Sequence, residues 1–248
     1  ILEHINCIPD DTEHITITGG EVGILKEDFI KVLETCKTYL LNTEFLVLTN
    51  GRVFSVGNYT EKISKVTPNN IRFAIPIYAS QSKLHDEITR VQGSFKQALT
   101  GIYNLINKNI DVEIRIVVLK KNYNELENIA KFIVENIQQV KMVNIMALEM
   151  TGNAFKNKEK VWINFSDVND YLYKACMKLI ENGIVTNLYN FPLCCIDERL
   201  YSISRKSITD YKIRYKEQCE GCTAQDWCGG FFNSTINIKD IIIKPIKS

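Results

Sequence analysis

The sequence predicts an α/β fold in which crossover helices cover a parallel sheet. Short runs of β-branched and apolar residues alternate along the chain with longer segments whose apolar residues recur at helical spacing. The short runs are continuously apolar, as is typical of parallel strands buried on both faces. An open doubly wound sheet and a barrel both produce this alternation, so the periodicity leaves both architectures open.

Six segments combine β-branched residues with continuous apolar character, and we expect each to be a strand. They are 15–18, 45–49, 71–77, 112–119, 143–148 and 184–189.

Four amphipathic helices are expected between these strands, because apolar residues fall on one helical face in 25–40, 95–106, 126–137 and 168–179. Asn124 and Glu127 have the spacing of a capping box before the third helix. Ser166 is expected to cap the fourth helix.

The alternation stops after the last expected strand, and a loop-rich segment with several cysteines follows. We therefore expect two domains, with residues 1–183 forming the α/β part and residues 184–248 forming a small C-terminal subdomain.

The amino-acid composition of the chain excludes several classes of protein. The chain has 248 residues, 45% of them hydrophobic, which suits a sizeable core and not disorder. Its 30 basic and 29 acidic residues lack the basic footprint of a nucleic-acid binder. No apolar run reaches the roughly 18 residues that a membrane helix needs. The segment from Ile1 to His4 has no secretion signal and no initiator Met, so we expect a cytoplasmic protein of which this chain is a fragment.

Eight cysteines are present, and their placement favours a metal site dominated by thiolates. Cys219, Cys222 and Cys228 form a C-x2-C-x5-C pattern, and either Cys194 or Cys195 could supply a fourth ligand. Four thiolates suit an iron–sulfur cluster or a zinc ion. Free thiols in a mobile tail are the remaining alternative.

Three other cysteines are expected to be structural. Cys36 and Cys176 lie on the apolar faces of expected helices, where core packing is the usual role. Cys7 lies beside two isoleucines ahead of a turn.

A strand that runs into Gly19-Gly20-Glu21 is the second informative feature. Paired glycines allow close approach of a ligand to the backbone. A Glu at the carboxyl end of a parallel strand lies where α/β folds place their ligands, and a cationic ammonium would suit it. An ordinary strand-to-helix turn explains the same residues, so the motif alone is weak.

With these features together, the sequence resembles the radical S-adenosylmethionine (SAM) superfamily. Thr18-Gly19-Gly20-Glu21 resembles the family's motif on the second strand, Thr49-Asn50-Gly51 resembles the end of the third, and Glu113-Ile114-Arg115 resembles the fifth. The resemblance implies a partial (β/α)6 barrel that lacks its first strand. Arg115 could instead be half of a structural ion pair with Glu113 or Glu149.

A narrower resemblance is to the radical SAM maturases of His-Xaa-Ser peptide systems, and it extends over nearly the whole chain. The segments that carry it are 9–14, 147–152, 207–210, 219–222 and 228–232. In that family the C-terminal cysteines imply an auxiliary [4Fe–4S] cluster. The upstream ligand follows a Pro-Leu pair, which favours Cys194 over Cys195.

The resemblance also implies roles for individual residues. Glu21 would bind the SAM ammonium group, and Arg115 would bind the SAM carboxylate. The backbone of Gly19 and Gly20 would lie close to SAM, Asn50 would lie near the ribose, and Glu149 would lie near the substrate or the adenosyl end. The metal ligands would be Cys194, Cys219, Cys222 and Cys228.

The implied activity is reductive cleavage of SAM to a 5′-deoxyadenosyl radical, which abstracts hydrogen from a peptide. The implied partners are that peptide, a possible partner maturase, and an electron donor such as flavodoxin or ferredoxin, with no nucleic acid and no membrane.

Two departures from the family pattern matter. The Cys-x3-Cys-x2-Cys motif that holds the SAM-binding cluster is absent, and we expect it upstream of Ile1, so that the chain as given would be inactive. Val22 stands where the family usually has Pro. The competing hypothesis is a non-catalytic peptide-binding module, with a degenerate barrel and a four-thiolate zinc or iron–sulfur site.

Overall fold

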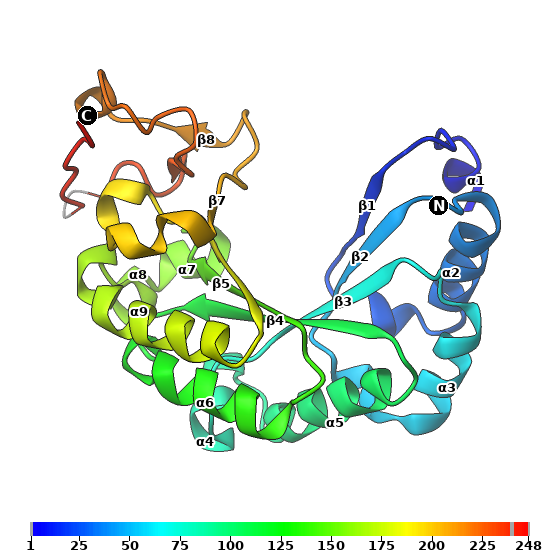
Figure 1. The fold of residues 1–248 in the computed structure, drawn as a ribbon. Coiled ribbons are helices and arrows are strands. Elements are labelled where there is room, and N and C mark those ends of the chain that lie inside the picture. The colour runs from blue at the N-terminus through cyan, green and yellow to red at the C-terminus, as the bar shows by residue number, and fades with distance from the viewer. Residues whose placement is uncertain (1, 239–240, 248) are drawn as a thin grey trace. The chain divides into compact units, whose positions relative to one another are not determined.

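The computed structural model describes residues 2–238 and 241–247 and has an α/β fold (Figure 1). Seven strands form one sheet in the order β1-β2-β3-β4-β5-β6-β7. The chain divides into two compact units, and the division falls within β4 (Asp111–Val118). Unit 1 comprises 1–77, 81–114 and 139–141, and unit 2 comprises the remainder. None of the described helices is long and apolar enough to span a bilayer.

Unit 1 contains three parallel strands in sequential order. Ile15 lies opposite Phe45, which in turn lies opposite Ile71, so hydrophobic residues align across all three strands. The strands are β1 (His14–Ile17), β2 (Glu44–Leu48) and β3 (Ile71–Pro76), and the helices are α1 (Leu2–Ile5), α2 (Glu27–Tyr39), α3 (Gly57–Val66), α4 (Ser82–Thr89) and α5 (Ser94–Ile106).

The core of unit 1 is centred on Phe54, which is fully buried in the 3-10 turn after β2 (Arg52–Ser55). Its ring meets that of Phe73 edge to face with 5.2 Å between centroids. Its carbonyl accepts hydrogen bonds from the Thr60 hydroxyl at 2.7 Å and from the Asn104 amide at 2.9 Å. These contacts fix the loop at the carboxyl end of β2 against α3 and α5.

Unit 2 contains β5 (Met142–Ala147), β6 (Val185–Tyr189) and the short β7 (Ser204–Arg205), all parallel. Its helices are α6 (Leu126–Asn136), α7 (Gly152–Lys156), α8 (Lys158–Val161) and α9 (Phe165–Glu181). Helices α6 and α9 lie side by side (Figure 1). Their apolar faces, which include Ile129, Ile133, Leu172 and Leu179, are fully buried.

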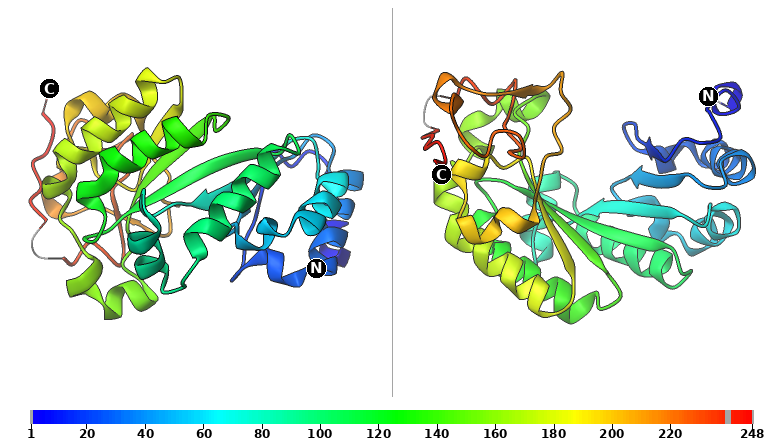
Figure 2. Two further views of the ribbon diagram at one scale, coloured as in Figure 1. Left: turned by 90° about the horizontal axis from the view of Figure 1, so that it is seen from below. Right: turned by 45° about the horizontal axis from the view of Figure 1, so that its top comes forward.

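The C-terminal part of unit 2 has little regular structure. Strands β8 (Ile213–Arg214) and β9 (Phe231–Phe232) form a two-residue antiparallel pair. The segment 241–247, drawn in red in Figure 2, runs back along this region. Thr223 holds it by donating both its backbone N–H and its hydroxyl to the carbonyl of Ile246, each at 3.0 Å.

The predicted α/β class with a parallel sheet is confirmed, and each of the six predicted strands lies within one or two residues of its observed bounds. The cores of the four predicted helices are confirmed too. Three details are wrong. Leu25 belongs to a separate 3-10 turn and is 52% exposed. Glu125 and Asn164, rather than Asn124 and Ser166, precede the third and fourth helices, and neither makes a side-chain cap.

Helices α1, α3, α4, α7 and α8 have no counterpart in the sequence prediction. They are 4 to 10 residues long, too short for a clear helical period. The expected boundary at residue 184 remains a prediction, since unit 2 includes residues on both sides of it. The predicted truncation point, Ile1, lies outside the described residues.

Candidate functional site

The loop after β1 and the loop after β2 are joined by the carboxylate of Glu21. Its Oε1 accepts hydrogen bonds from the Gly23 backbone N–H at 3.0 Å and from the Thr49 hydroxyl at 2.5 Å. Its Oε2 accepts one from the Asn50 backbone N–H at 2.7 Å. A carboxylate offers about four acceptor positions. Three are filled from within unit 1, so Glu21 is held rigidly with one position left for an external donor.

Thr49 is buried at the carboxyl end of β2 and extends this network. Its hydroxyl oxygen accepts a hydrogen bond from the Gly51 N–H at 3.2 Å while donating to Glu21. Gly51 has φ +76°, which favours glycine. A Cβ at Gly51 would lie 2.8 Å from Ile75, and a Cβ at Gly101 of α5 would lie 2.1 Å from the Gly51 carbonyl. The loop after β2 therefore requires glycine at position 51, and its close packing on α5 requires glycine at position 101.

Gly19 and Gly20 behave differently. Both are exposed, neither has a positive φ, and a Cβ built on either would meet nothing within 4 Å. The packing of the chain itself therefore does not require glycine here. The space beside them is open, so a ligand could approach the backbone as predicted.

Asn50 is exposed, and its side-chain oxygen accepts the N–H of Arg52 at 3.0 Å. This local turn leaves the Asn50 amide N–H groups to face solvent or a ligand. Its backbone N–H is already donated to Glu21. The structure therefore brings together Glu21 and Asn50 of the predicted SAM site, both in unit 1.

The other two predicted SAM-site residues, Arg115 and Glu149, belong to unit 2. Arg115 is half-buried on β4. Glu149 lies two residues beyond β5 and forms an ion pair with Lys212 at 3.7 Å. The predicted roles of these two residues remain predictions.

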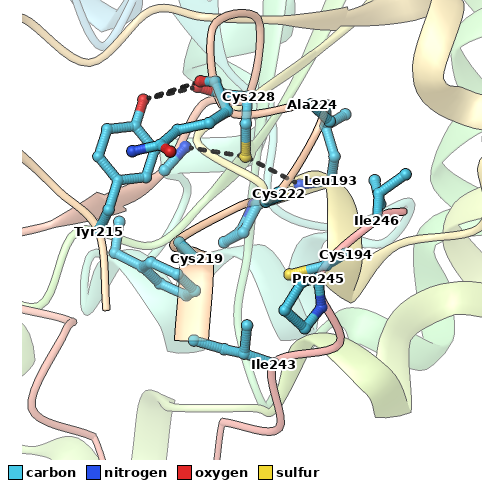
Figure 3. A pocket seen from close by; sticks show the side chains of 14 residues that line it. Leu193, Cys194, Tyr215, Cys219, Cys222, Ala224, Cys228, Ile243, Pro245 and Ile246 are labelled. Carbon is cyan, nitrogen blue, oxygen red and sulfur yellow. Dashed lines mark hydrogen bonds between the residues drawn. The ribbon is translucent and has the colours of Figure 1, made fainter. Parts of the chain in front are cut away.

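A second site lies in the C-terminal part of unit 2, where Cys194, Cys219, Cys222 and Cys228 line one pocket (Figure 3). These are the four cysteines named as metal ligands from the sequence. The cavity between these side chains is small, about 10 Å³. Its other walls are largely apolar, with Leu193, Phe231, Ile243 and Ile246 among them.

The sulfur of Cys228 accepts two backbone hydrogen bonds, from the N–H groups of Leu193 and Gly230, both at 3.4 Å (Figure 3). Such N–H donors stabilise a thiolate and tune an iron–sulfur cluster. Burial nevertheless raises the pKa of the free Cys228 thiol, and neighbouring thiolates add to this effect. The Tyr215 hydroxyl donates to the Cys228 carbonyl at 3.2 Å and fixes the same turn.

Cys194 and Cys195 are adjacent in a 3-10 turn (Leu193–Cys195), and only Cys194 lines the pocket. Cys194 faces the pocket, whereas Cys195 is buried outside its lining and points its sulfur toward the carbonyl of Ile242 at 3.7 Å. The two sulfurs lie 3.9 Å apart. Their hydrogen bond lowers the pKa of Cys194 to about 7 and raises that of Cys195, so Cys194 is the more readily available as a thiolate.

The four cysteines of the pocket do not form a closed site for a metal ion. Within residues 2–238 and 241–247, no three His, Cys, Asp or Glu side chains lie close enough together to hold one metal ion. Four cysteines instead contribute to the lining of one pocket. Their chemistry fits a thiolate-ligated group, either an iron–sulfur cluster or a zinc ion.

The remaining cysteines do not belong to this site. Cys36 and Cys176 are buried in helices as predicted, and burial raises their pKa to about 11 and about 12. Such thiols are inert. Cys7 is exposed and does not contribute to the core, so a packing role for it is not supported.

Sequence reasoning missed Thr49 as a partner of Glu21, and missed Thr223 and Ile246 around the cysteine pocket. For Thr49, a polar residue that ends a buried strand next to a glycine turn was the available signal. For the C-terminal segment, the apolar run Ile241-Ile242-Ile243 was a signal of burial, but its sequence does not say where it packs.

Comparison with known proteins identifies the family to which the sequence is similar. The sequence model of the Radical SAM superfamily matches residues 1–133, more than half of the chain. A curated relative, the probable GTP 3′,8-cyclase of Sulfurisphaera tokodaii, is 24% identical over 149 residues, which cover 59% of this chain and 45% of the relative. The chain therefore spans a little under half the length of that relative.

Three solved structures share the fold. A domain of pyruvate-formate lyase-activating enzyme from Bacteroides vulgatus has a TM-score of 0.55 at 14% identity, over 71% of this chain and 98% of that one. Streptococcus suis SuiB bound to S-adenosylmethionine gives 0.53 at 15%, over 71% and 37%. Native anSMEcpe with bound AdoMet and Kp18Cys peptide gives 0.57 at 14%, over 75% and 54%. At these identities the likeness establishes the fold, which is of the radical SAM type.

Proposed function

Because the chain belongs to the radical SAM superfamily, we propose that it is the SAM-binding and auxiliary-cluster part of a peptide-modifying enzyme. The observation that carries the proposal is the pocket lined by Cys194, Cys219, Cys222 and Cys228, far along the chain from the Glu21 loop. Two structural neighbours hold SAM, and one of these also holds a peptide. The motif resemblance described above supports the narrower assignment to the His-Xaa-Ser maturases.

SAM and the cluster that reduces it would supply the radical chemistry, and the protein would bind and orient the reactants. Glu21 is suited to bind the SAM ammonium group, because its carboxylate is fixed by Gly23, Thr49 and Asn50 and keeps one acceptor position. The open space beside Gly19 and Gly20 gives SAM access to that carboxylate. Asn50 is proposed near the ribose, while Arg115 is proposed for the SAM carboxylate and Glu149 for the substrate end.

The upstream motif Cys-x3-Cys-x2-Cys would bring the cluster that reduces SAM. β1 is the first strand in the order of the sheet, and no described strand pairs with its outer edge. Its residues are only half-buried or exposed, although parallel strands are usually covered on both faces. An additional parallel strand from upstream would pair with that edge.

The C-terminal cysteines would hold a second [4Fe–4S] cluster, in the subdomain proposed for residues 184–248. Cys194 is proposed as the upstream ligand because it faces the pocket and Cys195 does not. The N–H groups that reach Cys228 would stabilise a thiolate ligand there. This cluster could anchor the substrate or accept an electron from the product radical.

The test is SAM binding, measured by calorimetry on anaerobically reconstituted protein that includes the upstream segment. Glu21→Ala and Arg115→Ala should each lower the SAM affinity at least about tenfold, since each removes a charge partner. Gly20→Ala should lower it without changing the stability of the protein, because the structure has room for the methyl group. Unchanged affinity in all three variants would contradict the proposal and favour the non-catalytic module.

A further inference from the structure

A second hollow in unit 2 lies beside the segments that follow β4 and β5. It is lined by Lys120, Lys158, Glu159, Trp162, Ile163, Asn164 and Asp167, and it has about 730 Å³ of atom-free space, part of it continuous with solvent. Ligands of α/β folds bind at the carboxyl ends of parallel strands, where these segments begin. None of these residues belongs to the SAM or cysteine sites described above.

Two backbone segments form the rigid rim of this hollow. The Lys120 N–H donates to the carbonyl of Val161 at 2.9 Å, and the Lys120 ammonium donates to the carbonyl of Glu159 at 3.1 Å. The Trp162 N–H donates to the carbonyl of Lys158 at 2.8 Å. The loop after β4 is therefore fastened to α8.

Lysines outnumber acidic residues in the chain segments 120–121 and 156–167 that form this rim. Lys120 and Lys158 line the hollow together with Glu159 and Asp167, and Lys121, Lys156 and Lys160 lie within two residues of these two lysines along the chain. All of these lysines are exposed except Lys158, which is half-buried. Among the described residues, Lys156, Lys158 and Lys160 form no ion pair. This excess of lysines over acidic residues is confined to these segments, because the chain as a whole has a net charge of only +1.

Trp162 supplies an apolar surface in the same hollow. Its ring packs edge to face on Phe165 with 5.4 Å between centroids, which fixes the indole in place. Trp162 remains half-buried, so part of it is accessible. A fixed aromatic surface beside the ammonium groups of Lys120 and Lys158 suits a peptide, whose apolar and charged side chains alternate over short distances.

We propose that this hollow binds an acidic segment of the peptide substrate, with the lysines pairing with its carboxylates and Trp162 contacting its apolar side chains. The inference rests on the proposed function as a peptide-modifying enzyme and adds the chemical class of the substrate. Glu159 and Asp167 favour a peptide over a nucleic acid, because separate carboxylates on a peptide can avoid them whereas a continuous phosphate backbone cannot.

The experiment uses the fluorescence of Trp162 as the readout. The chain has two tryptophans, so Trp227→Phe leaves Trp162 as the reporter. This variant is titrated with a ten-residue peptide of alternating Glu and Ala, and with the same peptide carrying Gln in place of Glu. The acidic peptide should bind at least about tenfold more tightly than the neutral one, and its affinity should fall as salt is added.

Lysine variants test whether the acidic peptide binds in this hollow. Lys158→Glu should weaken binding of the acidic peptide at least about tenfold, whereas Lys174→Gln, an exposed lysine farther along α9, should leave it unchanged. Equal binding of both peptides, or equal binding by the Lys158→Glu variant, would overturn the inference. Tighter binding of a ten-nucleotide RNA than of the acidic peptide would also overturn it. The titration needs neither cluster nor SAM, so its failure would leave the proposed function standing.

Discussion

The Thr49 hydroxyl donates a hydrogen bond of 2.5 Å to the carboxylate of Glu21, and this bond joins the ends of the first two described strands. Glu21 was expected to meet a ligand, yet it is first a structural partner within its own unit. The two roles are compatible, because a carboxylate fixed by three donors needs no reorganisation when a fourth donor arrives.

Thr49→Val should weaken this loop and lower the free energy of unfolding by about 1.5–3 kcal/mol, the usual contribution of a hydrogen bond to a charged group. Urea unfolding measures the change. Thr49→Ser keeps the hydroxyl and should recover most of the loss. If the valine and serine variants were equally stable, the hydrogen bond to Glu21 would contribute nothing to the free energy of unfolding.

Gly101→Ala should destabilise unit 1 by about 1–3 kcal/mol through overpacking, because the added methyl group would lie 2.1 Å from the Gly51 carbonyl. Gly57→Ala is the matched control within a helix. Its methyl group meets nothing within 4 Å, so the variant should be neutral or more stable by up to about 1 kcal/mol. Thermal unfolding of both variants provides the comparison, and equal effects would contradict the close packing of α5 on the loop.

His85 should make stability depend on pH. It is 2% exposed beside Phe95, and burial lowers its pKa to about 4, opposed by the nearby Asp86. The unfolded chain has the ordinary histidine pKa of about 6.5 and binds a proton first as the pH falls. Stability linked to His85 is therefore complete above pH 6.5 and is lost between pH 6.5 and 4, by up to about 3 kcal/mol.

His85→Leu should remove most of that slope, as measured by urea unfolding at pH 7, 6, 5 and 4. Asp86 sets a background in the same direction, since hydrogen bonds from the Phe95 N–H, the Gly93 N–H and the Ser94 hydroxyl lower its pKa. That background is confined to the acidic end of the range. A parental slope between pH 6.5 and 5 that persists in His85→Leu would contradict a buried, neutral His85.

The C-terminal segment should protect the cysteine pocket. Ile243, Pro245 and Ile246 line that pocket, and Thr223 holds the segment in place. In reduced, metal-free protein, removal of residues 239–248 should speed the reaction of Cys219 and Cys228 with an aromatic disulfide reagent, followed by mass spectrometry. Thr223→Val should have a smaller effect in the same direction. Removal of residues 247 and 248 alone is the control and should change nothing.

The fold was largely predictable, because buried parallel strands can be recognised in the sequence as unbroken runs of apolar and β-branched residues. β3 and β5, for example, were placed within one or two residues. The short helices α7 and α8 were not predictable, since one or two turns have no periodicity to detect. Ser166 has the chemistry of a helix cap, but the backbone turns at Asn164, and side-chain type alone does not fix the turn.

Within the candidate sites, the spacing of cysteines pointed to Cys194, Cys219, Cys222 and Cys228, which line one pocket, and their role as metal ligands stays a prediction. Contacts between segments that are distant along the chain could not be predicted from the sequence. The bond from Thr49 to Glu21 crosses 28 residues, and that from Thr223 to Ile246 crosses 23. Such pairs leave no local pattern, because each partner is an ordinary turn or strand residue until the fold brings it to the other.

We propose that the four cysteines of the C-terminal pocket hold an iron–sulfur cluster as thiolates. The most direct test is the iron, sulfide and zinc content of anaerobically purified protein, compared with Cys194→Ala and Cys195→Ala. We predict about four irons and four sulfides per chain beyond any SAM-binding cluster, lost in Cys194→Ala and retained in Cys195→Ala. One zinc and no sulfide, or equal loss in both variants, would contradict an iron–sulfur cluster ligated by Cys194.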